Sequence, residues 1–155
     1  MNLEQAIRIA ASIHAGQKDK QGQPYILHPL RVMLTLNTEE ERILAVLHDT
    51  IEDSSWVTFR ATAEMVTGSA QPLPAALFDA LNAITRRKDE QYATYIERLG
   101  ENRLARVVKL TDLHDNMLPE RMLPTAEGAS LRQRYAEAQA RLLTIAWLDY
   151  AMRKD

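Results

Sequence analysis

The sequence contains no cysteine among its 155 residues. Disulfide bonds, zinc–thiolate sites and thiol nucleophiles are therefore excluded, and the lack of thiols fits a cytoplasmic protein. The sequence also lacks an apolar run of about eighteen residues, the length that a membrane span requires. Its N-terminus has no basic segment followed by an apolar one, as a secretory signal would. We therefore expect neither a membrane span nor a secretion signal.

An excess of charge of one sign is also missing. The formal net charge is −2, from 19 basic and 21 acidic residues. A surface that binds duplex nucleic acid needs a strong positive excess, so we expect no nucleic-acid partner. A local basic pocket for a phosphorylated small molecule is compatible with this balance.

Strand-like alternation of apolar and polar residues is absent, and apolar residues recur at helical spacing instead. The sequence therefore predicts an all-α protein. Because no linker or repeat divides the chain, we expect one helical bundle over residues 1–155. Asn2 with Gln5 and Thr38 with Glu41 are capping-box pairs that begin helices. The expected helices are 3–14, 29–36, 39–53, 58–65, 75–84, 92–99, 103–118 and 130–152.

Side chains of the metal-ligand type occur in three separate segments. At about 100° per residue, residues 48, 49, 52 and 53 would share an arc of roughly 140° on one helix. Such crowded carboxylates repel one another unless a positive group neutralises them. The three segments carry His28, then His48-Asp49 with Glu52-Asp53, and then Asp112 with Asn116 one turn later.

The apolar residues around positions 43–51 suggest that part of this acidic cluster points inward. A buried carboxylate without a partner is costly, so a bound divalent cation is expected. Two imidazoles with two carboxylates suit Mn²⁺, Fe²⁺ or Zn²⁺ better than Mg²⁺ or Ca²⁺. Each residue alone is more typical of a surface or capping role, and only their combination indicates a metal site.

Four motifs in a fixed order resemble a known family. They are His14-Ala-Gly-Gln17, Gly22-Gln-Pro-Tyr25-Ile-Leu-His28-Pro-Leu30, Leu47-His48-Asp49-Thr-Ile-Glu52-Asp53, and Val108-Lys109-Leu-Thr-Asp112 through Asn116. This pattern resembles the hydrolase domain of RelA/SpoT-type alarmone enzymes, which act in the stringent response, and more closely the stand-alone small alarmone hydrolases. The resemblance covers about residues 6–116 and implies an α-helical HD domain.

The resemblance also implies a site and a reaction. The reaction is removal of the 3′-pyrophosphate from ppGpp or pppGpp, which gives GDP or GTP. We expect no synthetase activity within 155 residues. By this resemblance, His28, His48, Asp49 and Asp112 bind one Mn²⁺, Glu52 and Asp53 form the catalytic acidic pair, and Asn116 contacts the nucleotide.

The chain departs from the family pattern at two places. Asp19 stands where the family usually has an arginine before the lysine, and Leu113-His114-Asp115 replaces the usual Arg-Leu-His. These differences leave the nucleotide open, so an adenosine alarmone or a phosphorylated dinucleotide is an alternative substrate. A nucleotide-sensing module without catalysis is an alternative of another class.

Further expectations concern the rim of the site and a partner chain. We expect a metal-activated water that Glu52 and Asp53 orient. Basic residues would offset phosphate charge, although a solvated charged loop explains them equally well. Apolar residues at the end of the last helix suggest a homodimer. The basic residues are Lys20, Arg86, Arg87 and Lys88, and the apolar ones are Trp147, Leu148 and Met152.

Overall fold

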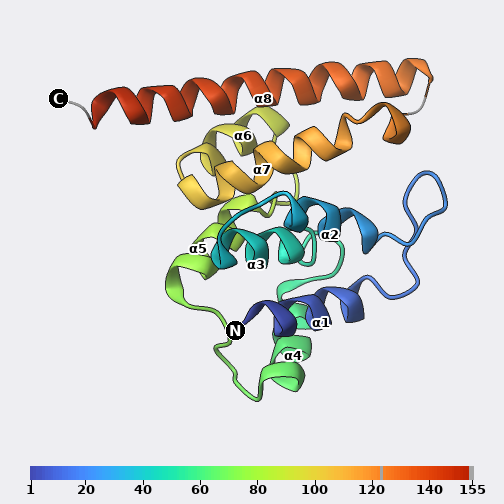
Figure 1. Cartoon of the computed structure of the whole chain (residues 1–155), viewed down its shortest axis with the longest axis vertical. Coiled ribbons are helices and arrows are strands. Elements are labelled where there is room, and N and C mark those ends of the chain that lie inside the picture. Colours follow the sequence, from blue (N-terminus) through green and yellow to red (C-terminus); the bar gives the residue numbers. More distant parts are fainter. Residues whose placement is uncertain (123, 154–155) are drawn as a thin grey trace.

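The structure, a computed structural model, describes residues 1–122 and 124–153, and this part contains eight α-helices, one 3-10 helix and no strand. The all-α prediction is confirmed. Residues 123, 154 and 155 of the predicted single domain lie outside the described part. The elements are α1 (Leu3–Ile13), α2 (Leu27–Leu34), α3 (Glu39–Leu47), α4 (Trp56–Thr67), α5 (Ala75–Ile84), α6 (Tyr92–Gly100), α7 (Arg103–Asn116), η1 (Pro119–Arg121) and α8 (Ala126–Met152) (Figure 1).

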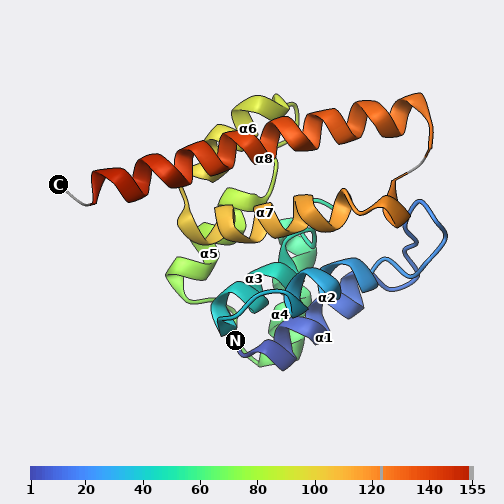
Figure 2. The same ribbon diagram turned by 45° about the horizontal axis from the view of Figure 1, so that its top comes forward.

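Helices α3 and α7 form the centre of the bundle. Every residue from Ile43 to Leu47 of α3 is buried, and α3 packs on α1, α2, α5 and α7. Helix α7 also packs on α5, α6 and α8, so it lies between the N-terminal helices and the last helix (Figure 1, Figure 2). The segments that carry the predicted ligands therefore meet inside the molecule.

The predicted capping boxes are present at the starts of α1 and α3. The Asn2 side chain accepts the backbone N–H of Gln5 at 2.9 Å, and the Thr38 hydroxyl accepts that of Glu41 at 3.2 Å. Such a cap stabilises a helix by about 1 kcal/mol, because it satisfies backbone donors that have no partner within the helix.

The predicted extension of α3 to residue 53 is wrong, because the helix ends at Leu47. Thr50 explains the early end. Its backbone N–H and its hydroxyl both donate to the Leu47 carbonyl, at 3.0 and 2.6 Å. A threonine hydroxyl that takes a helical carbonyl competes with the continuing helix. Residues 48–52 consequently form turns and residue 53 a bend, and Asp53 N–H donates to the Asp49 carbonyl at 3.0 Å.

Three other helix starts lie earlier than predicted. Helix α2 begins two residues before Pro29. Helix α4 is capped by Ser55, whose hydroxyl accepts the Thr58 N–H at 3.1 Å, and α8 is capped by Thr125. Serine and threonine are preferred N-caps. In both helices the residue that caps the helix lies before the position at which the helix was predicted to begin.

The loop between α1 and α2 folds back toward η1 (Figure 2). The Asp19 carboxylate accepts the backbone N–H groups of Gln21 and Gln23, each at 2.9 Å. Gly22 has a φ of 77°, a conformation that favours glycine. The Gln21 amide donates to the Glu120 carbonyl next to Arg121. Asp19 thus shapes the loop that carries the lysines of the site.

Helix α8 runs along one edge of the molecule and packs on α6 and α7 (Figure 1, Figure 2). Helix α6 approaches α8 closely at Gly100, where an added Cβ would lie 2.5 Å from the end of the Ile145 side chain and would force that side chain to move. None of the described helices, α8 included, combines the length and the apolar character of a membrane span.

Candidate metal centre and its cavity

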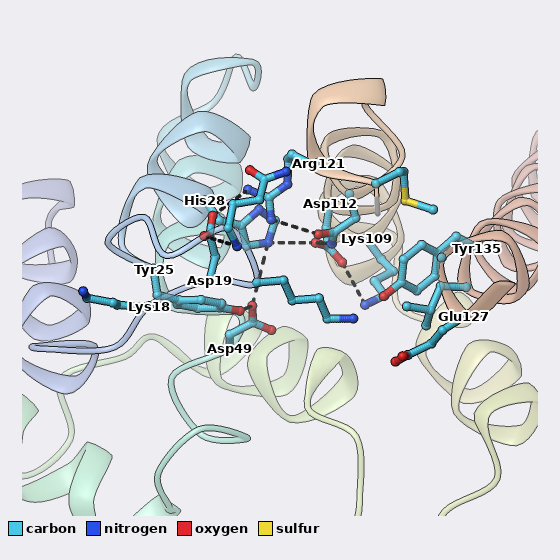
Figure 3. A pocket seen from close by; sticks show the side chains of 16 residues that line it. Lys18, Asp19, Tyr25, His28, Asp49, Lys109, Asp112, Arg121, Glu127 and Tyr135 are labelled. Atoms are coloured by element: carbon cyan, nitrogen blue, oxygen red, sulfur yellow. Dashed lines mark hydrogen bonds and ion pairs between the residues drawn. The ribbon is translucent and has the colours of Figure 1, made fainter. Parts of the chain in front are cut away.

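Four side chains from three segments converge on one point. His28 comes from α2, His48 and Asp49 from the turn after α3, and Asp112 from α7. His28 Nε2 lies 3.0 Å from Asp112 Oδ1, and His48 Nε2 lies 3.0 Å from Asp49 Oδ2. The crossed distances are 3.8 Å from His28 to Asp49 and 3.6 Å from His48 to Asp112. Figure 3 shows His28, Asp49 and Asp112 turned toward one another.

The cluster is buried and attracts positive charge. The side chains of His28, His48 and Asp112 are 2%, 1% and 4% exposed. Burial by itself lowers the pKa of both histidines, but the neighbouring carboxylates outweigh burial and raise the pKa of each ring above its usual value. The site therefore favours a proton or a metal cation between its imidazoles and carboxylates.

The second nitrogen of each histidine has a fixed partner. His28 Nδ1 lies 2.7 Å from Asp115 Oδ2, and His48 Nδ1 lies 2.7 Å from the Ala45 carbonyl. Both partners are acceptors, so Nδ1 of each ring carries the hydrogen and a neutral ring keeps its Nε2 lone pair for the cluster. This arrangement is typical of metal-binding histidines.

The chemistry of these donors fits a divalent metal ion. Ligand atoms of His28, His48 and Asp49 lie within 4.8 Å of one another, and Asp112 adjoins both histidines. His48 Nε2 is buried and makes no hydrogen bond within the described residues, although Asp49 Oδ2 lies 3.0 Å away. A buried polar nitrogen without a partner is costly, and a cation among these four residues would remove that cost.

Asp112 is also held by two groups on its own helix. Lys109 Nζ lies 2.8 Å from Asp112 Oδ2, and the Asn116 amide donates to Asp112 Oδ1 at 2.6 Å. Burial tends to raise the pKa of Asp112, but Lys109 and the two histidines keep it well below its usual range. Asp112 is therefore ionised, as a metal ligand must be.

A cavity of about 340 Å³ opens beside this cluster. Its acidic floor includes Asp49 and Asp112, while Tyr135 and Glu127 of α8 lie across from them (Figure 3). A cavity with an acidic metal-binding floor and a basic rim suits a ligand that carries phosphate. The basic residues that line it are Lys18, Lys20, Lys109 and Arg121.

Glu52 and Asp53 follow Asp49 but do not line this cavity. Glu52 Oε1 accepts the backbone N–H of Arg86 at 2.6 Å, and Asp53 Oδ2 lies 3.5 Å from His14 Nδ1. Burial of the two carboxyl groups raises the pKa of each above its usual value, and the Asp49 charge adds to the rise. Each is therefore tuned toward holding a proton, a property common at functional sites.

The predicted substrate-binding residues divide into two groups. Lys20 and Asn116 line the cavity, whereas Arg86, Arg87 and Lys88 do not. The loop after α5 that carries these three is exposed. The guanidinium of Arg86 donates to the Glu90 carbonyl of the same loop, at 2.5 and 3.0 Å.

Comparison with known proteins gives several relatives. No family model matches the chain. A protein of Aquifex aeolicus named guanosine-3′,5′-bis(diphosphate) 3′-pyrophosphohydrolase is 32% identical over 124 residues, 74% of this chain and 17% of that protein. A GTP pyrophosphokinase of Myxococcus xanthus is 27% identical over 164 aligned positions, 94% of this chain and 21% of that protein. A GTP pyrophosphokinase of Streptomyces coelicolor is 41% identical over 58 residues, 35% of this chain and 7% of that protein.

The chain is a homologue of the RelA/SpoT proteins. It spans between 7% and 21% of the length of these three relatives, so the similarity concerns one part of each.

The two departures from the RelA/SpoT pattern lie on either side of one arginine. Arg121 Nη1 is 3.8 Å from Asp19 Oδ2, and its Nε is 3.2 Å from Asp115 Oδ2. Its Nη2 also donates to the Asn116 amide oxygen at 3.2 Å. Asp19 and Asp115 are therefore parts of one network that reaches His28. The Arg121 side chain is 13% exposed, so solvent screens these contacts little.

Three residues that touch the ligand cluster are not among the predicted site residues. The Tyr25 hydroxyl donates to Asp49 Oδ2, Lys109 pairs with Asp112, and Asp115 holds His28. Asp115 is also fixed by Arg31, whose Nε donates to Oδ1 at 2.9 Å. Burial tends to raise the pKa of Asp115, but His28 and Arg31 keep it below its usual range. Two features of the sequence could have indicated such residues: the RelA/SpoT-like motif that contains Tyr25, and the three-residue spacing that puts Asp115 near Asp112 on a helix.

Proposed function

We propose that this chain is a metal-dependent phosphohydrolase that removes the 3′-pyrophosphate from ppGpp or pppGpp. One water would cleave the bond between the 3′ oxygen and phosphorus, giving pyrophosphate and GDP or GTP. The observation that carries the proposal is the convergence of two histidines and two carboxylates beside a cavity with a basic rim. The hydrolase name of the Aquifex aeolicus relative supports this reaction and substrate.

We further propose that His28, His48, Asp49 and Asp112 hold Mn²⁺. Imidazole and carboxylate ligands in this ratio suit such an ion. When bound, a divalent ion at this place acidifies a water molecule and offsets charge on phosphate oxygens.

The side chains around the cluster would perform the remaining steps. Glu52 would accept a proton from the attacking water, and Asp53 would help to orient it. Lys20 and Arg121 lie on the cavity rim, where they would bind phosphate oxygens. Asn116 lies beside Asp112 and would position the nucleotide.

Replacing Asp115 with alanine should weaken Mn²⁺ binding by about 10- to 100-fold, because His28 would lose the partner that fixes its ring. Isothermal titration of each protein with Mn²⁺ measures the change. Glu97→Ala is the matched control. It also removes a carboxylate, but one whose ion pair, with Arg141, is exposed. Equal affinity of the Asp115→Ala and wild-type proteins would show that Asp115 does not orient a ligand.

A second candidate is hydrolysis of another nucleotide, such as an adenosine alarmone or a phosphorylated dinucleotide. The Asp19 carboxylate lines the cavity at the position where the family carries an arginine, and this favours the alternative. A negative group there changes which phosphate or base the rim accepts.

The deciding experiment follows pyrophosphate and phosphate release from ppGpp, pppGpp and the alternative nucleotides. Purified protein with Mn²⁺ is compared with the same protein after chelation. Metal-dependent pyrophosphate release from ppGpp is the expected result. Turnover of only another nucleotide would support the second candidate, and binding of ppGpp by metal-loaded protein without turnover of any nucleotide would indicate a sensor.

A further inference from the structure

Helix α8 is buried along only one side. Its core-facing line includes Ala138 and Leu142, which are buried, and Ile145, which packs on α6 at Gly100. The views in Figure 1 and Figure 2 show no described helix on the side of α8 that faces away from α6 and α7. That outer side therefore meets solvent in the single chain.

The outer side carries a regular apolar line. Successive members are 4, 3, 4 and 3 residues apart, and at about 100° per residue the line lies roughly 150° from the core-facing line. Leu143, Trp147 and Tyr150 are 55%, 65% and 58% exposed. We call this line the outer seam, and its members are Ala136, Ala140, Leu143, Trp147 and Tyr150.

The spacing of the outer seam identifies the kind of surface that fits it. Apolar residues that alternate at 3 and 4 positions form the contact line of a two-stranded coiled coil. Large apolar side chains grouped on an exposed helix face mark an interaction site more often than a solvated surface. The natural occupant of such a seam is another helix with the same spacing.

We propose that the occupant is α8 of a second copy of this chain, packed parallel and in register. In a parallel pair of helices, a residue on one flank of the seam meets the residue five positions later on the other flank of the partner helix. Arg132 and Glu137 are five apart, exposed, and on opposite flanks. Arg132 therefore meets Glu137 of the partner subunit, and symmetry repeats the pair. An antiparallel arrangement loses this charge complementarity.

One polar position supports the same register. Three residues before Ala136, the line of the outer seam continues at Gln133, which is exposed. The Gln133 amide donates to Glu137 of its own helix at 3.0 Å. In the parallel register it also faces its own counterpart, the arrangement by which a single polar residue in an apolar seam specifies register. Of the residues expected to mediate a dimer, Trp147 lies on the outer seam. Leu148 and Met152 lie off it, roughly 100° and 140° around the helix from Trp147.

The proposed dimer has a consequence for the cavity. Leu131 and Tyr135, from the first half of α8, line the cavity. A parallel pair of α8 helices places the two cavities at the same end of the assembly. The helix that forms one wall of each cavity is then also stabilised by the partner subunit.

The first experiment measures the mass of the full chain at micromolar concentration by light scattering coupled to gel filtration. A dimer is expected for the wild type, and a monomer for Trp147→Glu and for Ala140→Glu. Met65→Glu is the matched control, because Met65 is an 88% exposed apolar residue on α4. It should remain a dimer. A monomeric wild-type chain, or dimers of all three variants, would overturn the proposal.

The absence of cysteine makes a second test of orientation straightforward. Ala136→Cys and Leu143→Cys are each oxidised alone. In a parallel in-register dimer each position faces its own copy, so both variants should form a disulfide-linked dimer. Cross-linking of only one variant would indicate an antiparallel or shifted pairing and would refute the register proposed. Neither test uses catalysis, so its outcome is independent of the proposed hydrolase activity.

Discussion

Asp49→Ala is expected to abolish divalent-metal binding and pyrophosphate release together. Asp49 Oδ2 lies 3.0 Å from His48 Nε2 and 3.8 Å from His28 Nε2, so its removal takes away one of two carboxylates at the cluster. Loss of a residue that only orients a metal ligand lowers metal affinity by up to about 100-fold. Because Asp49 is itself a proposed ligand, we expect its removal to lower Mn²⁺ affinity by more than that. Titration with Mn²⁺ and a release assay on the same preparation measure both effects.

The matched control for this change is Asp79→Ala, which removes an exposed carboxylate from α5. It should leave both Mn²⁺ affinity and turnover unchanged. Retained Mn²⁺ binding and turnover in Asp49→Ala would exclude Asp49 as a ligand. Retained binding with lost turnover would instead place Asp49 among the residues that act on water.

Glu52→Gln is expected to retain metal and lose about 10²- to 10⁴-fold in turnover, the range for loss of a general base. A glutamine oxygen still accepts the Arg86 N–H that Glu52 accepts at 2.6 Å, so the local turn keeps its anchor. Glu64→Gln on α4 is the isosteric control, because Glu64 is exposed. Unchanged turnover in Glu52→Gln would remove Glu52 from the mechanism.

The pH dependence of turnover gives a second test of Glu52. A general base works only when deprotonated, and burial with the Asp49 charge raises the pKa of Glu52 above the ordinary value of 4.5. The inactive protonated form therefore persists to higher pH than for an exposed glutamate. Wild-type turnover should fall on acidification with a midpoint above 4.5, and Glu52→Gln should lack that limb. An acidic limb that is identical in both proteins would assign it to another group.

Much of the fold followed from local sequence signals. Helix α5 has the predicted bounds, because prolines precede it, and α7 begins at Arg103 after the Asn102 cap. The end of α3 was not predictable from periodicity, because apolar spacing continues past Leu47 while the Thr50 hydroxyl takes the last carbonyl. That competition depends on a rotamer, which a pattern of apolar residues does not report.

The candidate site was predictable where the chemistry is local and hidden where it depends on crossing helices. His48 and Asp49 are neighbours, and the family motifs supplied His28 and Asp112. The contact of Asp115 with His28 joins residues 87 positions apart, so it requires the packing of α2 on α7. The basic run at Arg86 was expected at the substrate, but charge alone does not say which side of a loop faces a cavity.

The position of Arg121 between Asp19 and Asp115 bears on how this site can evolve or be re-engineered. Because the Arg121 guanidinium lies beside both carboxylates, and Arg31 also pairs with Asp115, we expect the effect of changing Asp19, Asp115 or Arg121 to depend on the other two. Introducing the family's arginine at position 19 alone would set two guanidinium groups against each other and would disturb the carboxylate that orients His28. A switch of nucleotide preference therefore has to exchange the loop residue and its helix partners as a set.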